Sequence, residues 1–373
     1  MSHAFQVGDD GLWVIEEPTK EAADKTKASL AAAGQKVYYE NGLSLVAGGG
    51  TLLPNITGLD GCGAQQDTHI MPVPSHTVKP PVLTEFQLEK WARRGEANPG
   101  VQEAVDSVST ARLEATVTTL QEIHTRNSYS TTLFDAETFM ANSLQELGFT
   151  ISYQQFLPSM APNIIAEWTP HGPSSEFVVA GAHLDSRSED TTDGTARAPG
   201  ADDNGTGSSC ILELARQINA TKLTFNRGLR LCLFTGEEQG LLGSRAIASK
   251  WAGEGVNIYA MANADMLGYQ STPTIEQAFM DRSMSPELTA YSKELIATYV
   301  SGLKTTDTGA CCSDQQSFYE NGYPSVGFFE SSNSATAYPS YHKQTDLLEN
   351  LNVEQLTLQV KAFTATVFSL LLD

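Results

Sequence analysis

The sequence predicts an α/β fold with three layers, α/β/α, in which a mixed, largely parallel central sheet lies between helices. A small N-terminal α+β domain is expected to precede it. Two observations predict this arrangement. From about residue 107 to the C-terminus, short apolar runs typical of buried strands alternate with longer segments whose apolar residues recur at helical spacing. Strands that alternate with helices form largely parallel sheets. Before this region, a proline-rich stretch sets apart a shorter N-terminal part.

The expected elements follow one another in a regular order. Two helices come first, at ARLEATVTTLQEIHTR (111–126) and FDAETFMANSLQELG (134–148). Strands are expected at 163–168, 176–185, 229–235, 258–266 and 324–330. Further helices are expected at 204–219, 240–252, 285–301 and 351–372. Ligands of such sheets bind beyond the carboxyl ends of the strands, so residues that follow the strands are the candidates for function.

The N-terminal part is expected to be separate from this body. The stretch MPVPSHTVKPPVLTE (71–85) contains four prolines in fifteen residues, a composition that favours an extended linker over a helix or strand. We therefore divide the chain into an N-terminal domain (1–75), a Pro-rich linker (76–106) and a main domain (107–373).

Composition argues against two classes of partner. The chain has 23 basic and 44 acidic residues and a net charge of −21, whereas surfaces that bind nucleic acid are basic. No stretch approaches the roughly 18 uninterrupted apolar residues of a membrane span. We therefore expect neither nucleic acid nor a membrane as partner, and we expect a monomer.

The N-terminus has no basic segment followed by an apolar one, so it is not a signal peptide as it stands. Either the protein is intracellular or the sequence begins after a signal. Two N-glycosylation triplets, Asn55-Ile-Thr57 and Asn219-Ala-Thr221, suit a secreted protein, although chance accounts for such triplets equally well. We expect a secreted, extracellular protein.

The five cysteines give a mixed picture. Cys210 and Cys232 lie in apolar segments and are expected to be small buried hydrophobic residues. Cys311 and Cys312 are adjacent, so a bond between them would need a strained ring. Two free thiols on a loop would be a liability outside the cell, and both states stay open. Cys62 has no obvious partner.

Histidines and carboxylates gather where the expected strands end. Any one of them alone is more often a hydrogen-bonded structural residue than a ligand. Their convergence at one edge of a single sheet favours a functional site. The candidates are His183, Asp185, Asp202, Asp203, Glu237, Glu238, Asp265 and His342.

Such a cluster would not be stable as bare charge, because buried carboxylates repel one another. A divalent metal offsets this repulsion and fixes the ligands. Imidazole and carboxylate ligands without thiolate suit catalytic zinc, with manganese or cobalt as alternatives. The candidate ligands outnumber the three of a single catalytic zinc, and two metals that share one carboxylate account for the surplus.

At these positions the chain resembles a known family, the co-catalytic di-zinc aminopeptidases of metallopeptidase clan MH, of the secreted bacterial and fungal leucyl aminopeptidase type. The resemblance covers about 107–373 and implies their phosphorylase/hydrolase-like zinc-peptidase fold. The matching stretches, in the family's order, are GAHLDS (181–186), PGADDNGTG (199–207), FTGEEQGLLGS (234–244), NADMLGY (263–269) and YHKQTD (341–346).

The resemblance implies a role for each residue that ligates two zinc ions. His183 and Asp265 would complete one zinc site, Glu238 and His342 the other, and Asp203 would bridge both. It also implies a cis peptide bond after Asp203.

Three further roles follow from the resemblance. Asp185 would orient His183 by a hydrogen bond to its second ring nitrogen. Glu237 would act as general base on the water activated by the two zincs and pass the proton to the leaving amine. Some relatives place an oxyanion-stabilising tyrosine near their paired cysteines, where the loop 308–318 of this chain has none. Other relatives place it immediately before the last histidine, where this chain has Tyr341, so the resemblance implies Tyr341 as the oxyanion donor. Aromatic packing beside the site is the alternative for Tyr341.

The substrate pocket is indicated only by residue type. Met266, Phe328 and Phe329 come close to the site in motif order and could line a hydrophobic pocket, and an ordinary core position is equally compatible with each.

We therefore predict a zinc-dependent aminopeptidase, a metalloprotease that hydrolyses the N-terminal peptide bond of peptides and prefers leucine-like residues. Residues 1–75 would form a propeptide of a zymogen or, alternatively, a permanent accessory domain. A glutaminyl-cyclase-like acyltransferase, which needs one zinc, is one rival function. A non-catalytic binding domain of peptidase-like fold is another, although such proteins typically lose ligands and this chain keeps them all.

Overall fold

The structure is a computed structural model. It describes the backbone of residues 2–7, 12–16, 36–41, 44–48 and 68–73, and the whole of residues 78–92, 97–168, 174–280, 284–308, 313–333 and 335–373. The N-terminal strands form one sheet in the order β3-β4-β2-β1-β5. They are β1 (Ser2–Val7), β2 (Leu12–Glu16), β3 (Lys36–Asn41), β4 (Ser44–Gly48) and β5 (Thr68–Val73).

An eight-stranded sheet forms the centre of the remaining chain, in the order β12-β11-β13-β10-β8-β9-β7-β6. Its middle strands, from β13 to β9, pair in parallel, whereas β11–β13, β7–β9 and β6–β7 are antiparallel pairs. The strands are β6 (Thr150–Gln154), β7 (Asn163–Trp168), β8 (Phe177–His183), β9 (Gly228–Phe234), β10 (Ile258–Ala264), β11 (Glu276–Met280), β12 (Lys304–Thr308) and β13 (Ser325–Phe329). The mixed, largely parallel sheet that the sequence predicts is confirmed.

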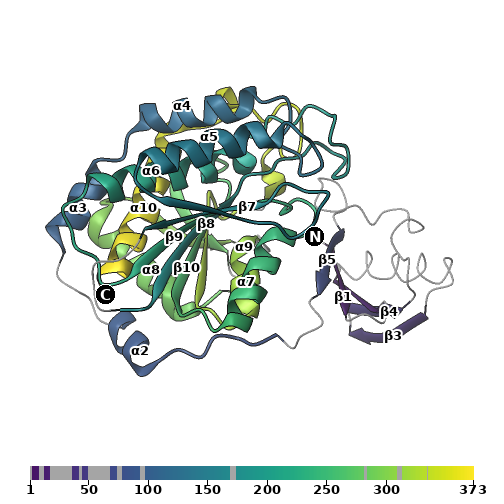
Figure 1. Ribbon diagram of the computed structural model, residues 1–373, viewed down its shortest axis with the longest axis horizontal. Coiled ribbons are helices and arrows are strands. Elements are labelled where there is room, and N and C mark those ends of the chain that lie inside the picture. The colour runs from purple at the N-terminus through teal and green to yellow at the C-terminus, as the bar shows by residue number, and fades with distance from the viewer. Residues whose placement is uncertain are drawn as a thin grey trace.

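Helices cover both faces of this sheet (Figure 1), which confirms the three-layer α/β/α prediction. One face is packed by α4 (Thr110–Glu122), α5 (Leu133–Glu146), α6 (Gly207–Ala220), α8 (Pro286–Tyr299) and α10 (Val353–Leu372). The other is packed by α7 (Leu242–Glu254) and α9 (Asp314–Glu320).

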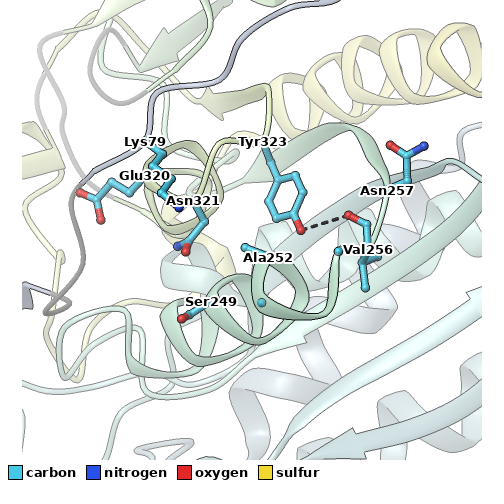
Figure 2. A pocket seen from close by; sticks show the side chains of 10 residues that line it. Lys79, Ser249, Ala252, Val256, Asn257, Glu320, Asn321 and Tyr323 are labelled. Atoms are coloured by element: carbon cyan, nitrogen blue, oxygen red, sulfur yellow. Dashed lines mark hydrogen bonds between the residues drawn. The ribbon is translucent and has the colours of Figure 1, made fainter.

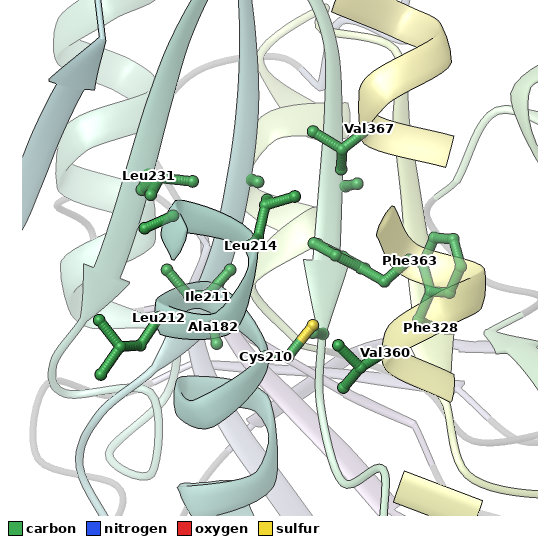
Figure 3. Packing of buried hydrophobic residues seen from close by; sticks show 14 of the residues in the cluster. Ala182, Cys210, Ile211, Leu212, Leu214, Leu231, Phe328, Val360, Phe363 and Val367 are labelled. Carbon is green, nitrogen blue, oxygen red and sulfur yellow. The ribbon is translucent and has the colours of Figure 1, made fainter. Parts of the chain in front are cut away.

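Side chains of each strand alternate between two apolar cores, as the pleat requires. On β9, Leu229, Leu231 and Leu233 belong to the larger core, which α6 and α10 complete, while Cys232 and Phe234 belong to the smaller core beneath α7 and α9. Figure 3 shows the larger core between α6 and α10. Burial on both faces explains why the central strands read as continuous apolar runs.

The long helix α10 owes its apolar composition to this burial. By length and composition it is the one described helix that could cross a membrane, yet 78% of its most apolar window is buried inside the fold. Its residues contact α3 (Pro99–Asp106), α4 and α8 as well as the sheet.

The expected linker departs from prediction over its second half. Residues 76–106 contain two helices, α2 (Glu85–Trp91) and α3. A capping box starts α2, in which Thr84 and Gln87 each hydrogen-bond to the other's backbone N–H. Asn98 caps α3, whose first residue is Pro99. The prolines of the stretch end at Pro81, and Pro99 occupies the first position of α3, where proline is tolerated, so neither helix has a proline in its interior.

Both helices pack onto the main body. Val101 and Val105 of α3 are buried against the large core. Trp91, the last residue of α2, is 5% exposed and meets the Tyr259 ring edge-on at 5.6 Å and stacks on the Tyr291 ring at 6.3 Å. The apolar core therefore includes residues that lie before position 107.

Cys210 and Cys232 are fully buried free thiols, as predicted. Burial raises the pKa of both, so neither ionises readily. Cys62, Cys311 and Cys312 lie outside the described residues.

Substituting Trp91 tests whether α2 is part of the body. We expect Trp91→Ala to lower the free energy of unfolding by about 3 kcal/mol or more, because a large buried ring leaves a cavity. Urea denaturation followed by circular dichroism measures this. Leu88→Ala on the same helix is the control, because Leu88 is 46% exposed and should change stability little. A loss at Trp91 no larger than at Leu88 would contradict the packing described.

Candidate active site

The residues singled out in the sequence meet at the carboxyl edge of the central sheet. His183 is the last residue of β8, Asp265 directly follows β10, and Glu237 and Glu238 follow β9 after a short turn. Because β8, β9 and β10 are parallel neighbours, their ends bring these side chains together. His342 joins them from the loop before α10.

Asp203 lies between the two histidines. Its Oδ1 is 3.3 Å from His183 Nε2, and its Oδ2 is 2.9 Å from His342 Nε2. His183 Nε2 is also 3.3 Å from Asp265 Oδ1, and His342 Nε2 is 3.3 Å from Glu238 Oε2. All five side chains predicted as metal ligands therefore form one continuous cluster with Asp203 at its centre.

Burial alone would raise the pKa of Asp203, but hydrogen bonds to His183 and His342 together with their charge lower it below its ordinary value. Asp203 therefore keeps its negative charge. Burial raises the pKa of Glu238 and, most strongly, of Glu237 above the ordinary range. The cluster has more carboxylates than its histidines can compensate.

Asp185 fixes the neighbouring backbone as well as His183. Its carbonyl oxygen lies 3.1 Å from His183 Nδ1, and its carboxylate Oδ1 lies 3.6 Å from the same nitrogen. The carboxylate also accepts the backbone N–H groups of Glu237 and Glu238, each at 3.3 Å. One buried aspartate thus ties the end of β8 to the turn that carries both glutamates.

The turn after β9 depends on Gly236. Its φ of 69° lies in the left-handed region, which glycine adopts without steric cost. Its N–H donates to Ser128 Oγ at 2.7 Å, and Ser128 in turn donates to Asp185 at 2.9 Å. Sequence reasoning did not find Ser128, because a serine in a polar loop carries no distinguishing signal.

The segment that carries Asp203 is held by buried polar groups. Asp346 accepts the backbone N–H groups of Asp202 and Asp203 at 2.9 and 3.0 Å. The fully buried Arg126 donates to the carbonyls of Pro199 and Gly200 at 2.5 and 2.9 Å. The peptide bond between Asp203 and Asn204 is cis, as the resemblance implies.

The donor set fits a metal. Two groups of residues each bring their potential ligand atoms within 4.8 Å of one another. One group is His183, Glu237 and Asp265, and the other is His183, Asp203 and Glu238. Among the described residues, none hydrogen-bonds to the buried Glu238 Oε1, and an unsatisfied buried carboxylate oxygen is costly unless a cation or donor meets it. Imidazole and carboxylate groups at this spacing are ligands that zinc takes.

Tyr341 lies directly beside the cluster. Its ring stacks on the His342 ring with centroids 3.6 Å apart, and burial raises the pKa of its hydroxyl well above the ordinary value. Met266 and Phe329 join Tyr341 in one small apolar cluster. Phe328 faces away and packs on Phe279 and Phe363 in the large core, as Figure 3 shows for Phe328 and Phe363.

A hollow of about 670 Å³ lies elsewhere, beside the amino ends of β10 and β13 (Figure 2). Lys79, Glu320 and Asn321 line one side of it, and Tyr323 donates to the Val256 carbonyl at 3.1 Å on the other. This is the edge of the sheet opposite to the histidines and carboxylates, so the hollow brings no residue to the cluster.

The structure adds Arg187, which sequence reasoning missed. Its Nε lies 3.1 Å from Glu238 Oε2, and its side chain is buried. An arginine among acidic loop residues reads as a solvated charge, so only the fold shows that the loop after β8 turns it inward.

Comparison with known proteins agrees with this geometry. The chain matches the model of Peptidase family M28 over residues 163–367, more than half of its length. It is 31% identical over 281 residues to a "Probable leucine aminopeptidase" of Trichophyton verrucosum (strain HKI 0517), an alignment that covers 70% of this chain and 71% of that relative.

Solved structures share the fold. The Legionella pneumophila LapA aminopeptidase matches with a TM-score of 0.74 at 22% identity, covering 92% of this chain and 96% of that one. A glutaminyl cyclase of Fimbriiglobus ruber matches with a TM-score of 0.60 at 18% identity, covering 70% of this chain and 95% of that one. At these identities the likeness shows the fold alone. From the family match and the curated relative, the chain belongs to Peptidase family M28 and is a zinc-dependent aminopeptidase, a metalloexopeptidase of the hydrolase class.

Proposed function

We propose that this aminopeptidase uses two zinc ions to remove N-terminal residues from peptides and prefers leucine-like residues. The observation that carries the proposal is the position of Asp203, whose two carboxylate oxygens face the Nε2 atoms of two different histidines. A carboxylate in this position can be shared by two cations. The preference follows from the small apolar cluster that adjoins the site, in which Met266 and Phe329 accompany Tyr341.

The cluster divides into two ligand sets around Asp203. His183 and Asp265 would hold one zinc, and Glu238 and His342 the other, because each pair lies within 3.3 Å. Zinc supplies positive charge that lowers the pKa of the attacking water and polarises the scissile carbonyl.

Glu237 is the group we assign to proton transfer. It follows the same strand as Glu238 but is only half-buried, and it lies within 4.8 Å of ligand atoms of His183 and Asp265. Its carboxylate takes the proton of the attacking water and returns it to the leaving amine nitrogen. Its neighbour Glu238 is held in ion pairs with His342 and Arg187.

Tyr341 is the proposed donor to the developing oxyanion. The stacking of its ring on His342 keeps it beside the cluster. A hydrogen-bond donor placed where negative charge develops lowers the barrier because its geometry is set in advance.

The fold does not separate this function from glutaminyl cyclisation, because a glutaminyl cyclase shares it. The curated relative at 31% identity supports peptide hydrolysis. A non-catalytic binding role is disfavoured because His183, Asp203, Glu238, Asp265 and His342 are all present and in contact.

We propose that residues 1–75 form a propeptide-like domain of a secreted, monomeric zymogen. The sequon Asn219-Ala-Thr221 supports secretion, since Asn219 is exposed at the end of α6. The contacts of Trp91 and Val101 with the core support a catalytic domain that begins before α2 rather than at residue 107.

Replacement of Glu237 by glutamine tests the proton-transfer role. We expect Glu237→Gln to lower kcat by at least about 10²-fold on leucyl and other aminoacyl amides, because the amide cannot accept the proton. Zinc content should stay at the wild-type level. Glu189→Gln, an exposed carboxylate nearby, is the control and should keep full activity. Undiminished activity in Glu237→Gln would remove this residue from the mechanism.

Metal removal tests the two-zinc assignment. Elemental analysis of the dialysed protein should give about two zinc ions per chain. Chelation should abolish release of free amino acids from peptides and lower Tm, because the buried carboxylates lose the charge that offsets their repulsion. Added zinc should restore both. A single zinc per chain combined with pyroglutamate formation would instead establish the cyclase alternative.

The tyrosine hydroxyl has a separate test. We expect Tyr341→Phe to lower kcat by about 10²-fold or more, the typical cost of losing an oxyanion donor, while zinc content and Tm stay unchanged. Steady-state kinetics on leucyl amides measure the effect. Wild-type kcat in Tyr341→Phe would mean that the ring serves packing alone.

A further inference from the structure

Arg187 contacts two of the proposed zinc ligands, Glu238 and His342. The residue is 2% exposed, its Nε lies 3.1 Å from Glu238 Oε2, and its Nη2 lies 2.5 Å from His342 Nδ1. A buried guanidinium therefore faces one half of the metal cluster, and its contacts reach both the carboxylate and the imidazole of that half.

The contact with His342 fixes the direction of a hydrogen bond. A guanidinium has five N–H donors and no acceptor, so Nδ1 of His342 must accept from Nη2. The hydrogen of the neutral ring then sits on Nε2, which faces Asp203 Oδ2 at 2.9 Å. A histidine that binds zinc through Nε2 needs the opposite arrangement, with a hydrogen on Nδ1 that is donated to an acceptor.

His183 has the arrangement that zinc requires. Its Nδ1 faces only acceptors of Asp185, the carbonyl oxygen at 3.1 Å and the carboxylate at 3.6 Å. In the neutral ring this favours the hydrogen at Nδ1, which would leave Nε2 to bind a cation held together with Asp203 and Asp265. The two histidines thus differ in readiness to bind zinc.

Charge acts in the same direction. The guanidinium already offsets the charge of Glu238, and a fixed cation raises the free energy of placing a divalent cation at the same carboxylate. Among the described residues, Asp203 and Asp265 form their ion pairs with histidines. Zinc held through Nε2 of His342 would require the ring hydrogen on Nδ1, where it would meet the N–H of Arg187, so the guanidinium would have to withdraw.

We propose that Arg187 makes the two halves of the cluster unequal. The His183–Asp265 half takes zinc first and tightly, and the Glu238–His342 half binds its zinc weakly because Arg187 competes for both of its ligands. Arg187 is thus a positioning residue that sets how much free zinc the enzyme needs to become fully loaded. This inference rests on the two-zinc assignment proposed above.

Zinc titration of the metal-depleted full chain against a chromophoric chelator tests the inference. Wild type should show two binding steps with Kd values at least about tenfold apart. Arg187→Met, which keeps an unbranched apolar stem but removes the guanidinium, should tighten the weaker step by about tenfold or more. The tighter step should change by less than about threefold.

Two controls accompany this titration. Arg245→Met removes another buried guanidinium, one that pairs with Glu320 outside the cluster, and should leave both steps unchanged. Arg187→Lys keeps the positive charge and should stay closer to wild type than Arg187→Met. The inference would be overturned if the Kd of the weaker step rose or stayed the same in Arg187→Met. Arg187 would then support the zinc ligands or leave them unaffected.

A second measurement keeps Arg187 in place and so does not depend on whether its variants fold. His342→Gln should remove the weaker binding step and keep the tighter one, and His183→Gln should remove the tighter step. Loss of the tighter step in His342→Gln, or of the weaker step in His183→Gln, would overturn the inference. These outcomes are separate from a failure of the proposed function, because binding steps are measured without substrate, whereas the function fails if zinc-loaded wild type releases no amino acid.

Discussion

Repulsion among buried carboxylates is the constraint on which the active site depends. Asp203, Glu237, Glu238 and Asp265 come from three separate segments of the chain but meet within a few ångströms, where two histidines cannot balance them. The parallel sheet forces this meeting, because strands β8, β9 and β10 end at one edge. A divalent cation relieves the repulsion, and this makes the metal part of the fold's electrostatics as well as of its chemistry.

The chain fixes the backbone around this charge with groups that do not enter the reaction. Asp185 accepts the N–H groups of both glutamates, and Asp346 accepts those of Asp202 and Asp203. Each buried carboxylate thereby gains donors that stabilise its own charge while it positions a neighbour. Preorganisation of this kind explains why the cluster holds together at the ends of loops, which are otherwise the mobile parts of α/β proteins.

The parts of the molecule predictable from sequence were those with a strong local pattern. The central strands are buried on both faces and are therefore recognisable as apolar runs. The candidate ligands follow these runs directly in the sequence. Edge strands such as β6 and β12 are short and polar, and α2 and α3 follow a stretch of prolines, so none of these was predicted. The roles of Arg187 and Ser128 depend on contacts with residues far away in the sequence, so no local spacing predicts them.

The adjacent glutamates show how position along one turn separates two roles. Both donate their backbone N–H groups to Asp185, so the same aspartate orients them. Beyond that their surroundings diverge. Glu238 turns inward to His342 and Arg187, whereas Glu237 is half-buried near His183 and Asp265. The left-handed φ of Gly236 just before them permits the turn. A regular strand would send neighbouring side chains to opposite faces of the sheet. The turn instead lets Glu238, a proposed metal ligand, and Glu237, the proposed general base, lie in one site.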